Sequence, residues 1–243
     1  PSRAPSRLSP VGGGTDVLQY CDTYGGVVLN ATIDRYAYAV IRTLDTPVVR
    51  FIASDQQQSV DLALTERYPL DSQLSLHKAV YNEIVASYNG GRPLAIELTT
   101  FCDSPVGSGL GSSSTVVVVM IRAFCELLNL ALDDYAIAHL AYKIERVDCA
   151  LKGGKQDQYS ATFGGFNFME FYEGDRVIVN PLRIKNWVLC ELEASLLLYY
   201  SGVSRESARI IADQSENVKQ KDNGTLEALH RMKQEAQSMK VAL

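Results

Sequence analysis

The sequence lacks any run of about 18 apolar residues, the length that a membrane-spanning helix needs. Its start also lacks the basic and then apolar pattern of a secretory signal. We therefore expect a cytoplasmic protein that binds no membrane. Positive charge is scarce too, because 23 lysines and arginines face 28 aspartates and glutamates and leave a net charge of -5. Nucleic acid needs a concentrated positive footprint, so it is not an expected partner.

Cysteine and histidine are sparse and scattered. The five cysteines are odd in number and never spaced C-x-x-C, which argues against a disulfide framework and a thiolate zinc site. The three histidines lie far apart, so we expect ordinary core or surface residues and no structural metal. What is present, 47% hydrophobic and 21% charged residues in a chain of 243, is typical of a packed globular protein.

Hydrophobic periodicity predicts a mixed α and β chain. It predicts strands at 27–33 and 36–41, joined as a hairpin at Asp34-Arg35, and further strands at 48–53, 60–64, 94–99, 166–171 and 187–200. Helical spacing predicts helices at 74–88, 112–130, 133–149, 204–219 and 225–243. The last of these carries apolar residues that need cover, which predicts further sequence downstream to bury them; they are Leu226, Leu229, Met232 and Met239.

The most informative stretch is rich in glycine and lies between a predicted strand and a predicted helix. It reads Pro105-Val106-Gly107-Ser108-Gly109-Leu110-Gly111-Ser112-Ser113-Ser114. Glycines let the backbone approach an anion, and the first N–H groups of the helix point at the same loop. The pattern predicts a phosphate cradle, with a flexible serine-capped turn as the alternative. It is not a Walker A loop, and a dinucleotide fingerprint would need glycine in place of Ser112.

A serine at the start of that helix could bind Mg²⁺ beside a bound triphosphate. A carboxylate should complete the shell of the ion. Glu145 is the candidate, because it lies on the apolar-flanked face of the next helix, where an unpaired carboxylate would be costly. The alternative is an ion pair of Glu145 with Arg146 or Lys143.

Three motifs together resemble the GHMP kinases, the family of galactokinase, homoserine kinase, mevalonate kinase and phosphomevalonate kinase. The glycine-rich stretch resembles the central motif of the family, with Ser114 where alanine is commoner. Arg3-Ala4-Pro5-Ser6-Arg7, followed by Gly12-Gly13-Gly14-Thr15-Asp16, resembles the first motif. Lys152-Gly153-Gly154-Lys155-Gln156-Asp157-Gln158-Tyr159 resembles the segment that presents the catalytic aspartate. The combination looks most like the D-glycero-D-manno-heptose 7-phosphate kinases, and the resemblance covers essentially all 243 residues, including 200–208.

The resemblance implies an α/β (α+β) fold of GHMP kinase type. Residues 1–181 would form an N-terminal, ATP-binding domain like ribosomal protein S5 domain 2. Residues 182–243 would begin a ferredoxin-like C-terminal domain. Nothing after Gly202 resembles the third, glycine-rich motif of the family. We therefore expect the C-terminal domain to be truncated.

The resemblance also implies a reaction with ATP and Mg²⁺, in which the γ-phosphoryl group moves to the anomeric hydroxyl of a heptose 7-phosphate. Asp157 would deprotonate that hydroxyl, with Arg7 beside it, although Asp157 could instead be a turn carboxylate. Ser113 and Glu145 would bind Mg²⁺. The nucleotide would contact Pro105, Gly107, Ser108, Gly109, Leu110, Gly111, Ser112, Ser113 and Ser114. The sugar phosphate would contact Gly13, Gly14, Thr15, Asp16, Lys152 and Lys155, unless the two lysines are simply solvated.

Two other functions stay open at this point. One is a hexose 1-kinase of the galactose or fucose type, which would take an unphosphorylated sugar. The other is a non-catalytic sugar or nucleotide sensor on the same fold. The presence of both Arg7 and Asp157 favours the enzyme. The sequence is compatible with a homodimer.

Overall fold

The computed structural model describes residues 1–71, 73–197, 199 and 207–243. Its centre is one seven-stranded sheet in the order β4-β3-β5-β2-β6-β7, with β1 paired to β2. Only β3 and β5 run parallel among the strand pairs of the described residues. The strands are β1 (Ser2–Val11), β2 (Gly26–Thr43), β3 (Val48–Ala53), β4 (Gln58–Ala63), β5 (Ile96–Cys102), β6 (Phe166–Phe171) and β7 (Val177–Pro181).

Strand β2 is a single strand of 18 residues, so the predicted hairpin at Asp34-Arg35 is wrong. A two-residue hairpin needs positive φ in its turn, and neither residue has it. Each half of the strand instead has its own partners. The first half pairs with β6, the second half pairs with β5, and β1 runs along both halves. The long strand thereby joins the two ends of the sheet.

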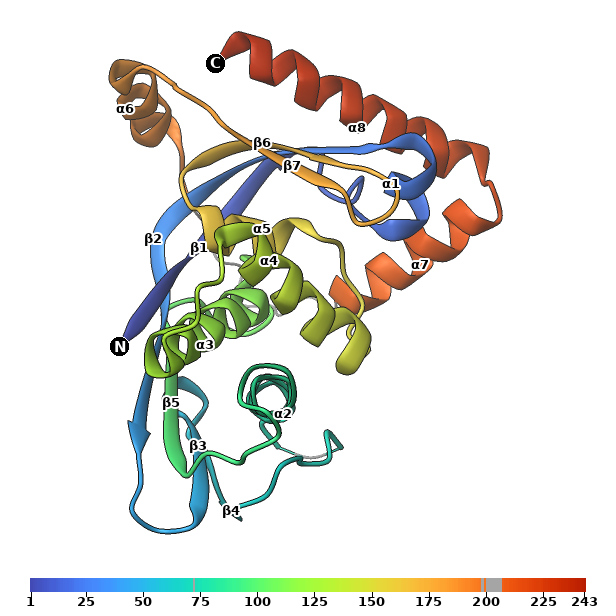
Figure 1. Ribbon diagram of the computed structural model, residues 1–243. Helices are drawn as coiled ribbons and strands as arrows, with labels where there is room; N and C mark the ends of the chain where they lie inside the picture. Colours follow the sequence, from blue (N-terminus) through green and yellow to red (C-terminus); the bar gives the residue numbers. More distant parts are fainter. Residues whose placement is uncertain (72, 198, 200–206) are drawn as a thin grey trace.

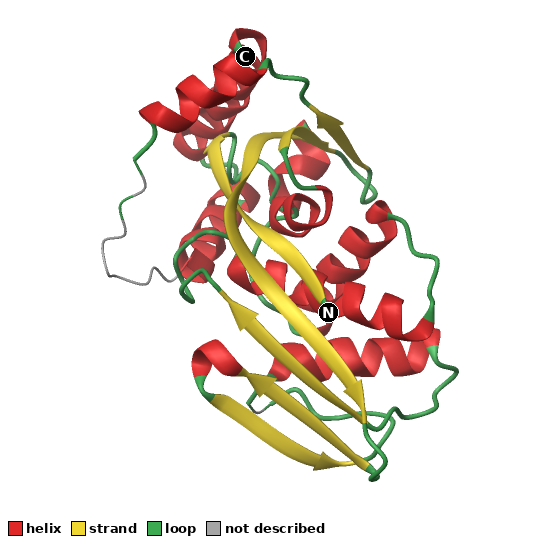
Figure 2. Cartoon of the chain, turned by 90° about the vertical axis from the view of Figure 1, so that its left-hand side faces the viewer, coloured by secondary structure: helices red, strands yellow, loops and turns green. Residues whose placement is uncertain are grey.

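The helices are α1 (Leu18–Tyr24), α2 (Ser75–Tyr88), α3 (Ser112–Leu128), α4 (Asp134–Tyr142), α5 (Gln156–Phe163), α6 (Asn186–Ser195), α7 (Ser207–Lys219) and α8 (Asn223–Ala242). Helices α2 to α5 cover one face of the sheet, and α8 lies against the other face at the β2–β6 end (Figure 1 and Figure 2). A 3₁₀ turn spans Ser54–Gln56, and α4 continues as a π-helical segment, Lys143–Asp148. No helix of the described residues is both long and apolar enough to cross a membrane. The mixed α and β class is confirmed.

The main apolar core lies between the sheet and helices α2 and α3. Phe51, Ile84, Leu98, Met120 and Phe124 are fully buried in it. The valine run of α3 has strand propensity, yet Val117, Val118 and Val119 are all buried in a helix, because α3 packs against other elements on several sides. The core thus fixes the position of α3, whose first residues follow the glycine-rich stretch.

One expectation for the C-terminal third is wrong. The strand predicted at 187–200 is helix α6 where the structure describes it, consistent with the helix-forming Leu, Glu and Ala of Asn186–Ser195; positions 198 and 200 lie outside the described residues. The truncation of the C-terminal domain stays a prediction, although the four apolar residues of α8 that were expected to need downstream cover pack within this chain. Leu229 is buried with Tyr20 and Val218, Leu226 and Met232 pack on that cluster, and Met239 packs on the cluster around Leu29.

Helices α7 and α8 pack on the N-terminal part of the chain, α7 on α1 and α8 on β1 and β2 (Figure 1). The start of the predicted helix 204–219, and most of the 200–208 segment of the resemblance, lie outside the described residues. The domain boundary near Pro181 stays a prediction. Besides α6, the helices and strands of the described residues that the sequence did not predict are β1, α1, α5 and β7.

Candidate active site

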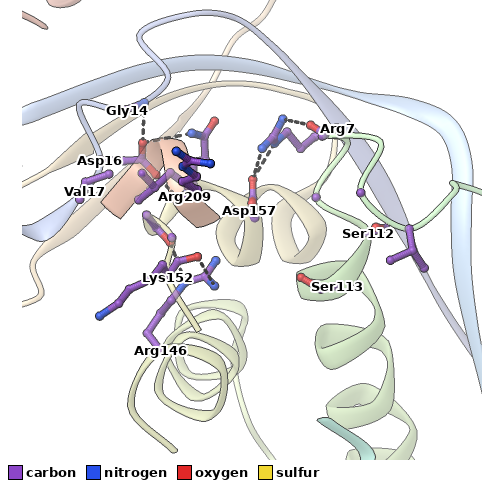
Figure 3. A pocket seen from close by; sticks show the side chains of 18 residues that line it. Arg7, Gly14, Asp16, Val17, Ser112, Ser113, Arg146, Lys152, Asp157 and Arg209 are labelled. Carbon is purple, nitrogen blue, oxygen red and sulfur yellow. Dashed lines mark hydrogen bonds and ion pairs between the residues drawn. The ribbon is translucent and has the colours of Figure 1, made fainter. Parts of the chain in front are cut away.

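A cavity of about 820 Å³ brings together segments that are far apart in the sequence (Figure 3). Its walls come from the N-terminal strand and loop, the glycine-rich stretch, the segment from Arg146 to Asp157, and α7. The lining residues are Arg7, Gly14, Asp16, Val17, Val106, Gly107, Gly109, Gly111, Ser112, Ser113, Arg146, Lys152, Gly153, Gly154, Gln156, Asp157, Arg209 and Ile211. Residues predicted for the nucleotide, the metal and the sugar therefore share one cavity.

The glycine-rich stretch is a loop that opens onto this cavity. Gly107, Gly109 and Gly111 all have φ near +75°, a conformation that side chains disfavour. Helix α3 begins at Ser112, so its free N–H groups face the same space. The structure does not bring every predicted residue to the lining. Pro105 is exposed, Leu110 accepts a hydrogen bond from the Arg7 N–H (3.1 Å), and the Ser108 hydroxyl is buried without a partner among the described residues.

Asp157 and Arg7 form an ion pair beside the loop. The Arg7 Nε donates to Asp157 Oδ1 at 2.7 Å, and Arg7 Nη1 donates to the Gly109 carbonyl at 2.9 Å. Asp157 lies in the first turn of α5, where the helix dipole favours a negative side chain. It is therefore not a simple turn carboxylate. Since Arg7 contacts both Asp157 and Gly109, it fixes the carboxylate relative to the glycine-rich loop.

Glu145 lies beneath the start of α3 and is completely buried. Its Oε1 accepts a hydrogen bond from Ser113 Oγ at 2.9 Å, and its Oε2 accepts one from Gln158 Nε2. Gln158 also donates to Ser114 Oγ at 3.1 Å, so Ser114 faces the interior. Lys143 pairs instead with Glu83, and Arg146 contacts backbone carbonyls, so the alternative ion pairs of Glu145 are absent. Glu145 lies on the π-helical segment, a feature that is frequent at functional sites.

The Ser113 hydroxyl and the Glu145 carboxylate are oxygen donors of the kind that Mg²⁺ accepts. Mg²⁺ usually keeps water and substrate phosphates in its shell, so two protein oxygens are a fitting set. No group of three or more histidine, cysteine, aspartate or glutamate side chains suited to a metal occurs among the described residues. The donor set therefore fits an ion that arrives with a nucleotide.

Asp16 is 1% exposed and accepts hydrogen bonds from three groups. They are the Gln156 N–H (2.9 Å), the Gln156 side-chain amide (3.0 Å) and the Gly14 N–H (3.1 Å). Burial raises the pKa of Asp16, and the Gln156 N–H opposes that shift. Thr15 and Gly13 do not line the cavity; Thr15 is fully buried and its hydroxyl accepts the Val27 N–H, so it holds the loop.

Lys155 does not reach the cavity, so its predicted sugar contact finds no support in the structure. Its side chain is buried, and its ammonium lies 2.8 Å from Asp175 and over the Tyr142 ring. Lys152 does line the cavity, together with Arg146 and Arg209, which sequence reasoning missed. Arg146 directly follows Glu145, and that position next to a candidate ligand was the available signal.

This fold and cavity define a kinase of small molecules, and the comparisons agree. Residues 75–165 match the model of the GHMP kinases N terminal domain. The chain belongs to the GHMP kinase family. The D-glycero-alpha-D-manno-heptose 7-phosphate kinase of Campylobacter jejuni is 48% identical over 242 residues, which span 100% of this chain and 70% of that protein. The predicted resemblance to the GHMP kinases, and to a heptose 7-phosphate kinase among them, is confirmed.

Solved structures confirm the fold. The crystal structure of a D-glycero-D-manno-heptose 1-phosphate kinase from Bacteroides thetaiotaomicron has a TM-score of 0.80 and 44% identity, covering 94% of this chain and 76% of that one. The mevalonate kinase of Methanococcus jannaschii has a TM-score of 0.63 at 16% identity, covering 97% and 78%. The second of these is a likeness of fold alone.

Proposed function

We propose that this protein transfers the γ-phosphoryl group of ATP to the anomeric hydroxyl of D-glycero-D-manno-heptose 7-phosphate, giving the 1,7-bisphosphate. The observation that carries the proposal is the Arg7–Asp157 pair, which lies against a glycine-rich loop at the start of a helix within one cavity. The similarity to heptose phosphate kinases supports the choice of sugar. A cytoplasmic location and a homodimer stay predictions.

Asp157 acts as the general base in this proposal. Its carboxylate accepts the proton of the anomeric hydroxyl while the hydroxyl oxygen bonds to the γ-phosphorus. The bond from that phosphorus to the β,γ-bridging oxygen breaks, and ADP leaves with the electron pair. Arg7 orients Asp157 and stabilises negative charge near the transferred group. Holding the two reactants in line accounts for much of the rate enhancement.

The nucleotide phosphates bind to the loop from Gly107 to Ser113. Three glycines with positive φ keep side chains away from the backbone, so N–H groups can contact phosphate oxygens. Ser113 and Glu145 would hold Mg²⁺, which when bound neutralises charge on the β and γ phosphates. Gln158 keeps the Glu145 carboxylate in place through a buried hydrogen bond.

Asp16 accepts hydrogen bonds from hydroxyls of the sugar, beside the Gly14 backbone. Its position is fixed by the hydrogen bonds to Gln156, the residue before Asp157. The sugar-binding carboxylate and the general base are therefore attached to the same turn of α5. Thr15 contributes indirectly, because its buried hydroxyl fixes the loop that carries Asp16.

Steady-state kinetics with a panel of acceptors test this function. The panel contains heptose 7-phosphate, heptose 1-phosphate, unphosphorylated heptose, galactose and fucose. We expect heptose 7-phosphate to exceed unphosphorylated heptose by about two orders of magnitude or more in kcat/KM, because each charge-assisted contact contributes roughly 1.5–3 kcal/mol and several act together. Phosphorus NMR of the product should show the new phosphate at C1.

Other results would point to the alternatives. Equal kcat/KM values for phosphorylated and unphosphorylated sugar would contradict the 7-phosphate assignment and leave the kinase assignment standing. Preference for galactose or fucose would indicate a hexose 1-kinase. Binding of ATP and sugar phosphate without turnover of any acceptor would indicate the non-catalytic sensor.

A further inference from the structure

Basic side chains gather at the end of the cavity opposite the glycine-rich loop. Figure 3 shows Arg146 and Arg209 on one side, Ser112 and Ser113 on the other, and Asp157 between them. Arg7 is paired with Asp157, but neither Arg146 nor Arg209 forms an ion pair within the described part of the chain. Two cations without a counter-charge at one end of a substrate cavity indicate an anionic ligand there.

The segment from Gly153 to Asp157 belongs to one wall of the cavity. It determines the order in which Arg146, Asp16 and Asp157 follow one another along that wall. A Cβ on Gly153 would lie 2.3 Å from the guanidinium carbon of Arg146, and one on Gly154 would lie 2.0 Å from Asp16 Oδ2. The next residues carry Gln156, which binds Asp16, and then Asp157. The order along the wall is therefore a cation, a hydroxyl acceptor and a general base. Residues 153 to 157 span at most about 14 Å even when extended, which one sugar phosphate can bridge.

We propose that Arg146, assisted by Arg209, binds the phosphate group of the acceptor sugar and makes the enzyme select a phosphorylated sugar. This inference rests on the proposed function. The anomeric hydroxyl then lies at Asp157, the ring hydroxyls at Asp16 and the distal phosphate at Arg146. The assignment moves the phosphate contact from Lys155, which is buried beside Asp175, to a residue on the cavity wall.

The contacts of Arg146 suit this role. Its Nε donates to the Gly154 carbonyl at 3.3 Å and its Nη1 to the Lys152 carbonyl at 3.4 Å. These hydrogen bonds orient the guanidinium, and Nη2 has no acceptor among the described residues, which leaves it for a phosphate oxygen. The two glycines give the arginine and Asp16 the space that a Cβ would fill. Lys152 lines the same cavity, but its ammonium end points away from Asp157 in Figure 3.

The test measures a preference, defined as kcat/KM for heptose 7-phosphate divided by kcat/KM for unphosphorylated heptose. A ratio cancels any loss of active enzyme. Arg146→Gln should lower the preference by about 10- to 150-fold, the loss of one or more charge-assisted contacts. Arg146→Lys should keep part of it, because the charge remains. Arg209→Gln, on the exposed side of α7, should lower it without disturbing the loop at 150–154, and Lys152→Gln should lower it least.

Arg35→Gln, an exposed arginine of β2 outside the cavity lining, is the matched control and should keep the wild-type preference. The inference is overturned if Arg146→Gln and Arg209→Gln both keep the wild-type preference. That result differs from failure of the proposed function, in which the wild-type enzyme itself shows no preference.

Discussion

Two interiors of this molecule are equally buried and differ in chemistry. The apolar interior lies between the sheet and helices α2 and α3, where residues such as Phe51, Leu98 and Phe124 are fully buried. The polar interior lies beneath the cavity, where Asp16 is 1% exposed and Glu145 is not exposed at all. Burial of apolar surface stabilises the fold whatever the relative orientation of the side chains in contact. A buried carboxylate, in contrast, costs free energy unless hydrogen-bond donors surround it.

The difference shows which interior tolerates change. The polar interior is held by directed contacts, such as Gln156 to Asp16 and Gln158 to Glu145, so each group has few acceptable substitutes. The apolar interior is held by packing, which tolerates other apolar residues of similar volume. We expect changes in the polar interior to act mainly on the reaction, and changes in the apolar interior to act mainly on stability.

The largest effect should come from Asp157→Asn. Asparagine keeps an oxygen for Arg7 but cannot accept the hydroxyl proton, so we expect kcat to fall by roughly two to four orders of magnitude with little change in KM for ATP. The melting temperature should change little, because Asp157 is partly exposed at 21%. Asp34→Asn, an exposed aspartate of β2, is the control. A near-normal kcat would remove Asp157 from the mechanism.

Local motifs made much of the site predictable from the sequence. Gly107, Gly109 and Gly111 are needed for positive φ before a helix, and a loop of that kind is readable as a phosphate cradle without any structure. The motif resemblance also placed Arg7, Asp157, Ser113 and Glu145 in one site, and the structure brings these four residues together.

The sequence could not show which way each side chain faces in the folded chain. Lys152 and Lys155 look alike in the sequence, yet one lines the cavity and the other pairs with Asp175 on the β6–β7 turn. Strand β1 contains Pro5 and little alternation, so only its partner β2 reveals it as a strand. The strand predicted at 187–200 was wrong because a short apolar run fits a strand and a helix equally well.

A smaller effect should come from His77, a polar residue within the apolar interior. Its Nε2 lies 2.8 Å from Thr100 Oγ1, and burial lowers its pKa from 6.5 to about 4. The unfolded chain therefore binds this proton at a higher pH than the folded chain does. The contribution of His77 to the free energy of unfolding is fully present above pH 6.5. It falls by up to about 3 kcal/mol as the pH decreases toward 4.

Denaturant unfolding between pH 7 and 4 tests the contribution of His77. Carboxylates titrate in the same range, so the informative quantity is the difference between wild type and His77→Gln. The variant should lose less unfolding free energy than the wild type over this range, whatever its stability at pH 7. His139→Gln, an exposed histidine of α4, should follow the wild type. Parallel curves for His77→Gln and wild type would contradict the prediction.

The smallest effect returns to the polar interior and concerns the metal. Ser113→Ala and Glu145→Gln each weaken the oxygen pair that would hold Mg²⁺, whose two atoms lie 2.9 Å apart. Since nucleotide phosphates and water supply the remaining ligands, we expect the Mg²⁺ concentration for half-maximal rate to rise only by about 2- to 10-fold per variant.

The measurement is a Mg²⁺ titration at fixed ATP and saturating sugar. Ser195→Ala and Glu126→Gln, both at exposed helix positions, are the controls. Unchanged titrations for both site variants would mean that nucleotide and water alone hold the metal, and that Glu145 serves to fix the start of α3.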